Sequence, residues 1–519
     1  MVRAERCGVR DENTAGDGAE HSGTGAASSS GEQEGHGRRR FLARAAAVGV
    51  TGGLLGAAGA ANADAKPNPR GGKGTLGPED LDADRLLLIP DLVLLPSGPE
   101  RGQAVLVERG TFKDIGRVSV LKAAHPDVRP VELPGQLLMP GFVDAHHHLT
   151  QSFGKALAFG RPSEIFKSVW EPLEHALDAD SARLAAQLAG LEALRGGFTT
   201  VADAGTRAPV DVAVVAEGAQ EAGIRCVLAK VVSDGKGGER HLSRWDGGTG
   251  KELIHPSLAI PVPENASDDV LVKTSALCAE ADAVFQIHVN EHLASVERSL
   301  KDVGRRPVQH LHHIGALGPQ LLGAHATLLT PEEMRMVADS GAALSYNPVA
   351  SAWKGNAVAH ATMWAALGIR FGTGTDGTRG DGFRVVDAAE SAQRLTHGMA
   401  IGDSVCGGGK RWLEHATAKS ADALGLGKVT GRVQKGYAAD FLLVDIGDTP
   451  ELTPSWDLLW ELVRLTDRDQ ITAVFVAGRL CIWQGWPPHW DGRELVRRAA
   501  RVGREVVRRA GLEPTAHRP

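Results

Sequence analysis

The chain has 519 residues, of which 42% are apolar and 23% are charged, and its formal net charge is −6. This length exceeds one average hydrophobic core, so we expect several packed units or one large barrel with an accessory domain. The negative charge argues against a nucleic-acid partner, and five cysteines without CxxC spacing argue against a disulfide framework or a cysteine zinc site.

The first 65 residues are expected to hold a disordered region and an export signal. Residues 1–37 are rich in Gly, Ala, Ser and Glu and show no apolar periodicity. An arginine pair, one further residue and a Phe-Leu dipeptide follow at 38–42, which is the twin-arginine pattern, and small residues near 61–65 offer a cleavage site. We therefore expect export by the twin-arginine machinery to the periplasm or the exterior. The alternative is a basic tail on a cytoplasmic protein, and no segment of the mature chain is predicted to be integral to a membrane.

The rest of the chain shows two patterns. Short β-type runs between Gly/Pro turns occupy residues 85–140 and return at 425–485, and we expect them to form one composite β-sandwich. Between them, 141–424 alternates strand-like and helical stretches, which is typical of a (β/α)8 barrel. A basic helix and tail, 486–519, end the chain. The predicted barrel strands are 141–148, 198–205, 224–232, 253–262, 285–291, 321–327, 342–348 and 369–377.

Polar residues stand at the carboxyl ends of these strands, where a barrel places its catalytic groups. In "LLMPGFVDAHHHL", His146 and His148 project to the same side of the first strand and can reach one ion, while His147 faces away. Imidazoles with one carboxylate suit Zn2+, with Fe2+ as a competitor, and leave room for an activated water. In chain order the candidate residues are His146, His148, His288, Glu291, His325 and Asp376.

With these residues in place, the sequence resembles the amidohydrolase superfamily, in the branch of cytosine, guanine and adenosylhomocysteine deaminases and triazine hydrolases. The resemblance covers roughly residues 85–485 and rests on the opening motif above with "IHVNEH", "LLGAHATLLTPEEM", "FGTGTDG" and "KGYAADFLLVD". It implies that Glu291 handles a ring-nitrogen proton and that His325 polarises the substituent on the reacting carbon. The metal ligands that it implies are His146, His148, His288 and Asp376.

Three positions depart from the family's pattern. "NPVASAWKG" replaces the common "PxSNxKL", Gly380 replaces a serine of purine-nucleoside deaminases, and Pro261 stands where a histidine often ends the fourth strand. His255, upstream of Pro261, is a candidate to replace that histidine. These changes affect substrate recognition and leave hydrolysis intact, so the sequence predicts a reaction without fixing an adenosine- or guanine-type substrate.

The predicted reaction is hydrolytic deamination of an amino-substituted nitrogen heterocycle through metal-bound hydroxide. Asp376 takes the proton of the water, Glu291 protonates the ring nitrogen, and His325 stabilises the developing charge. Glu291 can donate only if its pKa is raised above the usual value of about 4.3. Candidates to line the mouth of the site are Gln151, Trp170 and Trp353.

Two other functions stay open at this point. Hydrolytic ring opening of an imidazolone-type cyclic amide uses nearly the same ligands. An exported scaffold on an inactive barrel would belong to another class, but it would not need the ligands that are present. The expected partner is a small heterocyclic substrate, and self-association into a homo-oligomer stays open.

Overall fold

The structure is a computed structural model that describes residues 76–159, 161, 165–245 and 252–512. The predicted disordered region and twin-arginine signal lie outside this part of the chain, so export and signal cleavage stay predictions. Within the described ranges, no helix combines the length and the apolar character that a membrane crossing requires.

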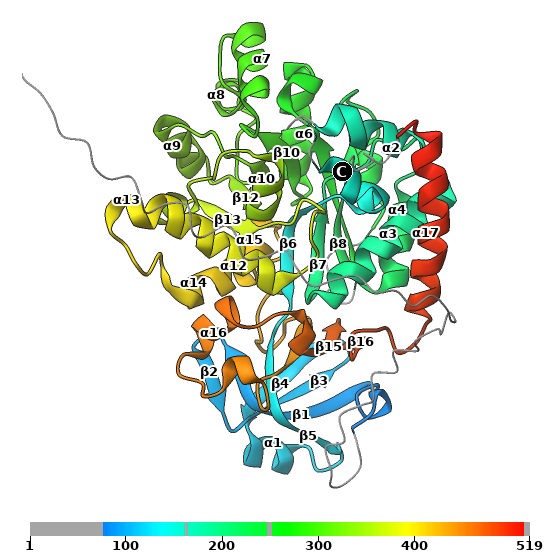
Figure 1. Ribbon diagram of the computed structural model, residues 1–519, viewed down its shortest axis with the longest axis vertical. Coiled ribbons are helices and arrows are strands. Elements are labelled where there is room, and N and C mark those ends of the chain that lie inside the picture. The colour runs from blue at the N-terminus through cyan, green and yellow to red at the C-terminus, as the bar shows by residue number, and fades with distance from the viewer. Residues whose placement is uncertain (1–75, 160, 162–164, 246–251, 513–519) are drawn as a thin grey trace, which may run out of the picture. The chain divides into compact units, whose positions relative to one another are not determined.

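The larger part of the fold is built around a parallel sheet of eight strands (Figure 1). Their order in the sheet is β13-β12-β11-β10-β9-β8-β7-β6. The predicted (β/α)8 barrel is confirmed. Its strands are buried on both faces, as in β6, where all six side chains are buried, which explains their nearly continuous apolar sequences. The strands are β6 (Phe142–His147), β7 (Phe198–Asp203), β8 (Arg225–Val231), β9 (Ile254–Ile260), β10 (Phe285–Val289), β11 (Leu321–His325), β12 (Ala343–Tyr346) and β13 (Arg370–Thr373).

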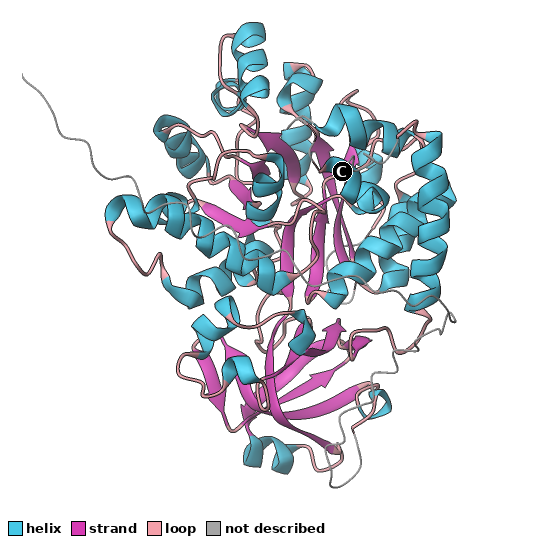
Figure 2. Ribbon diagram, in the orientation of Figure 1, coloured by secondary structure: helices cyan, strands magenta, loops and turns pink. Residues whose placement is uncertain are grey.

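Helices surround these strands (Figure 2). Local sequence signals set several of their ends: in α9, Thr330 and Glu333 form a capping box, and Gly341 ends the helix with a φ of 73°. The elements of this layer are η2 (Leu149–Ala158), η3 (Phe166–Trp170), α2 (Glu171–His175), α3 (Ala179–Arg195), α4 (Ala213–Ala222), α5 (Gly238–Leu242), η4 (Pro263–Asn265), α6 (Asp268–Glu280), α7 (Leu293–Val303), α8 (Pro307–His313), α9 (Pro331–Ser340), α10 (Pro348–Lys354), α11 (Ala361–Ala366), α12 (Gly382–Gln393), η5 (Arg394–Gly398), α13 (Met399–Ile401), α14 (Gly408–His415), α15 (Ala418–Ala423) and α17 (Gly492–Arg509).

The segments that flank the barrel pair into one mixed sheet, in the order β16-β15-β14-β5-β1-β3-β4 with β2 beside β1. Strands far apart in sequence meet in it: β14 pairs antiparallel with β5, with Phe441 opposite Pro140. The predicted composite β-domain is confirmed in this sheet. Its elements are η1 (Pro78–Asp80), β1 (Arg85–Leu95), β2 (Gly98–Arg101), β3 (Gln103–Glu108), β4 (Thr111–Arg117), α1 (Val118–Ala124), β5 (Pro130–Pro140), β14 (Phe441–Asp445), η6 (Pro450–Leu452), α16 (Leu458–Arg464), η7 (Arg468–Gln470), β15 (Ile471–Val476) and β16 (Arg479–Trp483).

The first and last barrel strands meet at the end that carries the candidate residues. The backbone N–H of Asp376, just after β13, donates to the carbonyl of His146 in β6 at 2.8 Å. This hydrogen bond brings together two predicted ligands that lie 230 positions apart in the sequence.

Candidate active site

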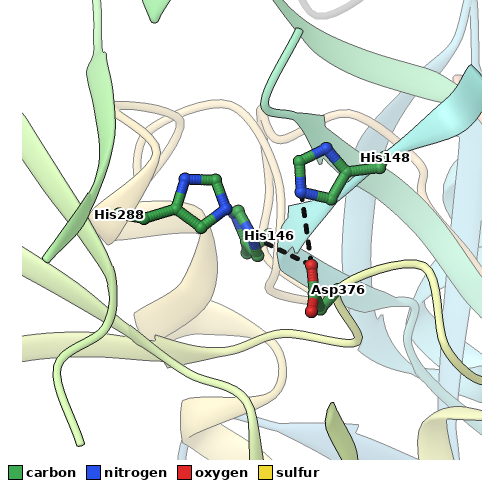
Figure 3. Close-up of side chains that lie close together, drawn as sticks. All are labelled: His146, His148, His288 and Asp376. Carbon is green, nitrogen blue, oxygen red and sulfur yellow. Dashed lines mark ion pairs between the residues drawn. The ribbon is translucent and has the colours of Figure 1, made fainter. Parts of the chain in front are cut away.

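The structure brings the four predicted metal ligands together at the carboxyl end of the barrel. One ligand atom from each of His146, His148, His288 and Asp376 can be chosen so that all lie within 4.8 Å of one another. The Nε2 atoms of His146 and His148 stand 3.3 and 3.2 Å from Oδ1 of Asp376 (Figure 3). His147 is outside this group, as its position on the strand predicted.

The donor set fits a divalent metal ion. Apart from its 3.3 Å contact with Oδ1 of Asp376, the buried Nε2 of His146 has no hydrogen-bond partner among the described residues, and such a buried polar atom requires an explanation. Burial lowers the pKa of His146 and lowers that of His288 well below its usual value, so both rings are neutral and have a lone pair for a cation. Neutral imidazoles with one carboxylate are typical zinc ligands.

The two groups of potential ligands among the described residues share one histidine. A second group of potential ligands, His288, Glu291 and His325, shares His288 with the first. Nδ1 of His288 is 2.8 Å from the carbonyl of Pro261, so it carries the proton and donates it. Only Nε2 of His288 is then free to bind a metal, so His288 can complete one of the two groups but not both.

Asp144 aligns two of the candidate ligands. Its carboxylate accepts from the backbone N–H of His146 at 3.1 Å, and from the N–H and hydroxyl of Thr375 at 2.9 and 2.5 Å. Burial raises the pKa of Asp144 to about 7, although the hydrogen bonds from Thr375 oppose this rise. Sequence reasoning gave this residue no role, even though its acid side chain is visible in the opening motif.

His325 is a neutral hydrogen-bond donor aimed into the site. Burial lowers its pKa to about 3. The amide Nδ2 of Asn347 lies 3.2 Å from Nδ1 of His325 and donates to it, which leaves the proton on Nε2. That atom is 3.6 Å from Oε1 of Glu291 and 3.9 Å from Oδ2 of Asp376. It has no hydrogen-bond partner among the residues that the structure describes, so its N–H is available to a substrate.

A buried lysine that the sequence analysis missed joins the two carboxylates of the site. Nζ of Lys354, the last residue of α10, is 2.7 Å from both Oε1 of Glu291 and Oδ2 of Asp376, and its side chain is 9% exposed. This lysine stands in "NPVASAWKG", which was noted only as a departure from the family's pattern. A sequence signal was therefore present, but nothing in it showed where the side chain points.

The electrostatics of Glu291 differ from the expectation. Burial alone would raise the pKa of this carboxyl, but the Nε2–H of the neutral His325, 3.6 Å from Oε1, and the ammonium of Lys354, 2.7 Å from it, hold this pKa well below its usual range. The prediction of a raised pKa is therefore wrong for the structure. A carboxylate that is ionised at rest has to take up its proton during the reaction.

Two of the predicted mouth residues line the pocket over this site. Gln151 and Trp170 lie in its wall with His148, His288, Glu291 and Asp376. Trp353 lines a smaller neighbouring pocket with Lys354 and Asp376, and its ring packs against Phe159 with centroids 4.4 Å apart. Arg207, which sequence reasoning did not select, also lines the main pocket and pairs with the fully buried Glu174 at 3.0 Å.

His255 does not replace the histidine that the family often places at the end of the fourth strand. It lies near the amino end of β9, with its ring 3.3 Å from Nη1 of Arg225. Arg225 in turn forms a buried ion pair with Asp440 at 2.9 Å. Pro261, at the carboxyl end, supplies a carbonyl to His288 instead of a side chain. The expectation about His255 is therefore wrong, because a residue at the start of a strand cannot reach the site at its end.

One end of the barrel thus carries a donor set for a divalent ion, a neutral histidine and two carboxylates. These groups are typical of a metal-dependent hydrolase. Residues 137–481, more than half of the chain, match the model of the amidohydrolase family. The chain belongs to the amidohydrolase family. It is thus an enzyme that acts on carbon–nitrogen bonds other than peptide bonds, rather than a scaffold.

Two relatives and two solved structures illustrate the similarity. The chain is 27% identical over 437 residues to a 5'-deoxyadenosine deaminase of Methanopyrus kandleri, covering 82% of this chain and 99% of that protein. It is 28% identical over 414 residues to a 5-methylthioadenosine/S-adenosylhomocysteine deaminase of Syntrophobacter fumaroxidans, covering 76% and 92%. The fold is similar to a zinc-bound adenosine deaminase of Xanthomonas campestris, with a TM-score of 0.74, 24% identity and coverage of 82% and 98%. It is also similar to the zinc complex of atrazine chlorohydrolase of Arthrobacter aurescens, with a TM-score of 0.69, 19% identity and coverage of 80% and 100%.

Proposed function

We propose that this enzyme removes the exocyclic amino group of an adenosine-type nucleoside by hydrolysis, with one Zn2+ held by the three ligand histidines and Asp376. The observation that carries the reaction is the convergence of this donor set with Glu291 and His325 at one end of the barrel. The names of the curated relatives, which are deaminases of 5'-modified adenosines, support the substrate class.

The described side chains divide the chemistry between them. When bound, a divalent ion supplies hydroxide at neutral pH. Asp376 accepts the proton that the water gives up, and its Oδ2 contacts Lys354. The Nε2–H of His325 donates a hydrogen bond to the substituent on the carbon under attack, where charge develops. Glu291, ionised at rest, takes up the second proton of the water and passes it to the neighbouring ring nitrogen. The C–O bond forms, the C–N bond breaks, and the amino group takes the proton held by Asp376 and leaves as ammonia, so that one water is consumed.

Lys354 is placed to couple the two proton-transfer groups. Because its ammonium contacts both carboxylates at 2.7 Å, it holds Glu291 and Asp376 at a fixed separation. It also keeps both ionised before the substrate enters, so each can accept a proton when the reaction supplies one.

The test is ammonia release from a panel of adenosine, 5'-deoxyadenosine, 5'-methylthioadenosine and S-adenosylhomocysteine, with Zn2+-loaded enzyme. We expect turnover of at least one, and at least a 100-fold loss in Glu291→Gln, the order that a general acid–base group contributes. The matched control is Glu297→Gln, an exposed glutamate on α7, which should keep full activity. Loss of ultraviolet absorbance without ammonia would mean ring opening. No reaction with any of the four nucleosides by zinc-loaded protein would refute the substrate class.

A further inference from the structure

The C-terminal helix α17 presents a line of arginines. Its 18 residues, "GRELVRRAARVGREVVRR", contain seven arginines, no lysine and two glutamates, in a chain of formal net charge −6. At 100° per residue, five arginines spaced by four, four, three and four residues fall on one side of the helix. We call these five, all exposed, the arginine stripe: Arg493, Arg497, Arg501, Arg504 and Arg508.

The opposite face of α17 is fixed to the barrel. Leu495, Ala499 and Val506 are buried, and Gly503 lies so close to Phe153 of η2 that an added Cβ would be 3.1 Å from its ring. Figure 1 shows α17 as the outermost helix beside α3. The arginine stripe therefore points away from the protein, and the apolar face is not available for insertion elsewhere.

Much of this positive charge is not neutralised within the protein. Arg504 and Arg508, and the neighbouring Arg498, form no ion pair with any residue that the structure describes, and the guanidinium of Arg493 lies over the ring of Trp486 at 4.4 Å. Within the stripe, only Arg497 and Arg501 form ion pairs with described acidic residues, and Glu494 is a partner of both. Unpaired guanidinium groups concentrated on a rigid, outward surface create a local positive potential that attracts anions.

We propose that the arginine stripe docks the enzyme on an anionic phospholipid surface. A straight, convex line about 22 Å long, at 1.5 Å per residue, can contact many headgroups of a planar bilayer at once. Arginine suits this role because its guanidinium binds phosphate through two parallel hydrogen bonds. Binding would be electrostatic and reversible, since the apolar face stays packed in the protein.

The structure favours a lipid surface over a nucleic acid. Single-stranded nucleic acids bind in basic grooves with aromatic rings on which bases stack, whereas this surface is convex. Trp486, the aromatic ring beside the stripe, is covered by the guanidinium groups of Arg195 and Arg493 at 4.1 and 4.4 Å, so it cannot stack on a base.

The test is co-sedimentation of the full chain with phosphatidylcholine vesicles that contain either no anionic lipid or 30% phosphatidylglycerol, roughly the anionic content at which such attraction is strong. The variant combines Arg498→Gln, Arg504→Gln and Arg508→Gln, which removes three exposed charges without an acidic partner. The matched control removes the same charge elsewhere through Lys236→Gln, Lys301→Gln and Arg335→Gln, all exposed positions.

We expect binding to the anionic vesicles alone, at low ionic strength, with a loss of about 100-fold in the α17 variant and little change in the control. Raising the salt to about 0.5 M should release the protein. Deaminase activity in solution should be equal in all three proteins, which separates this inference from the proposed function. No binding to anionic vesicles, or an equal loss in the control variant, would overturn it. Tighter binding to single-stranded DNA than to vesicles, lost in the same variant, would overturn the choice of lipid.

Discussion

Lys354→Met is the substitution with the clearest expected effect on both stability and activity. Methionine keeps most of the side-chain stem but removes the ammonium that contacts Glu291 and Asp376 at 2.7 Å. Two hydrogen bonds to charged groups are worth roughly 1.5–3 kcal/mol each, and removing one partner of a buried ion pair usually costs about 3–5 kcal/mol. We therefore expect metal-free Lys354→Met protein to lose about 3–5 kcal/mol of unfolding free energy.

The dependence on metal tests the electrostatic cause. A divalent cation beside Asp376 supplies part of the missing positive charge, so the Zn2+-loaded variant should lose less stability than the chelated one. The assay is urea unfolding of both forms of the wild type, Lys354→Met and Lys354→Arg, with Lys428→Met, an exposed lysine, as the control. The value of kcat should fall more than KM changes, with partial recovery in Lys354→Arg. Equal losses with and without zinc would refute the reasoning, because simple loss of packing does not depend on the ion.

Three further predictions concern the metal ligands, their support and pH. Chelation should abolish activity, and His288→Ala should bind well below one equivalent of Zn2+ by elemental analysis; full binding at wild-type affinity would contradict the ligand assignment. In Asp144→Asn the amide oxygen can still accept from the backbone N–H groups of His146 and Thr375, but the NH2 group faces the hydroxyl of Thr375 and cannot accept from it. Zinc affinity should therefore fall about 10- to 100-fold, and unchanged affinity in a competition assay would count against its aligning role. The pKa of His415 is lowered to about 4 by burial, so the stability from its neutral form is present above pH 6.5 and is lost as pH falls through about 4. Across 2.5 pH units this is at most about 3 kcal/mol, and His415→Gln should show a shallower fall of unfolding free energy between pH 6.5 and 4 than the wild type.

The barrel was predictable because its signals are local. All eight strands lie within the predicted ranges, as β6 (Phe142–His147) does within 141–148, since buried parallel strands read as short apolar runs between helical stretches. It was also predictable that His146 and His148 point to the same side of their strand, because side chains alternate with a two-residue period. Their meeting with Asp376 depended on closure of the barrel, which the eight-fold alternation indicated.

The contacts that complete the site were not predictable because they join residues far apart in sequence without a periodic pattern. Lys354 bonds Glu291 across 63 positions, and Asp144 bonds Thr375 across 231. Whether a lysine at the end of a short helix turns inward depends on the carboxylates that it meets there. The prediction for His255 was wrong for a different reason. Its strand was predicted correctly, but His255 lies near the amino end of β9, and the site is at the carboxyl end of the barrel.

The backbone at the carboxyl ends of the strands explains why the site residues lie where they do. Asn290, His325 and Asp376 adopt φ values of 48°, 68° and 55°, in a left-handed region that costs a residue with a side chain roughly 1–2 kcal/mol. Hydrogen bonds can offset such strain: the N–H of Asp376 binds the carbonyl of His146, and the side chain of Asn290 donates to Glu333 at 2.8 Å. An ordinary strand continuation would alternate these side chains between the two faces of the sheet. At the ends of β11 and β13 the chain instead takes a left-handed residue at His325 and Asp376, and the two side chains meet in the site, where Nε2 of His325 is 3.9 Å from Oδ2 of Asp376. Strain at these positions is therefore part of how the barrel assembles the site.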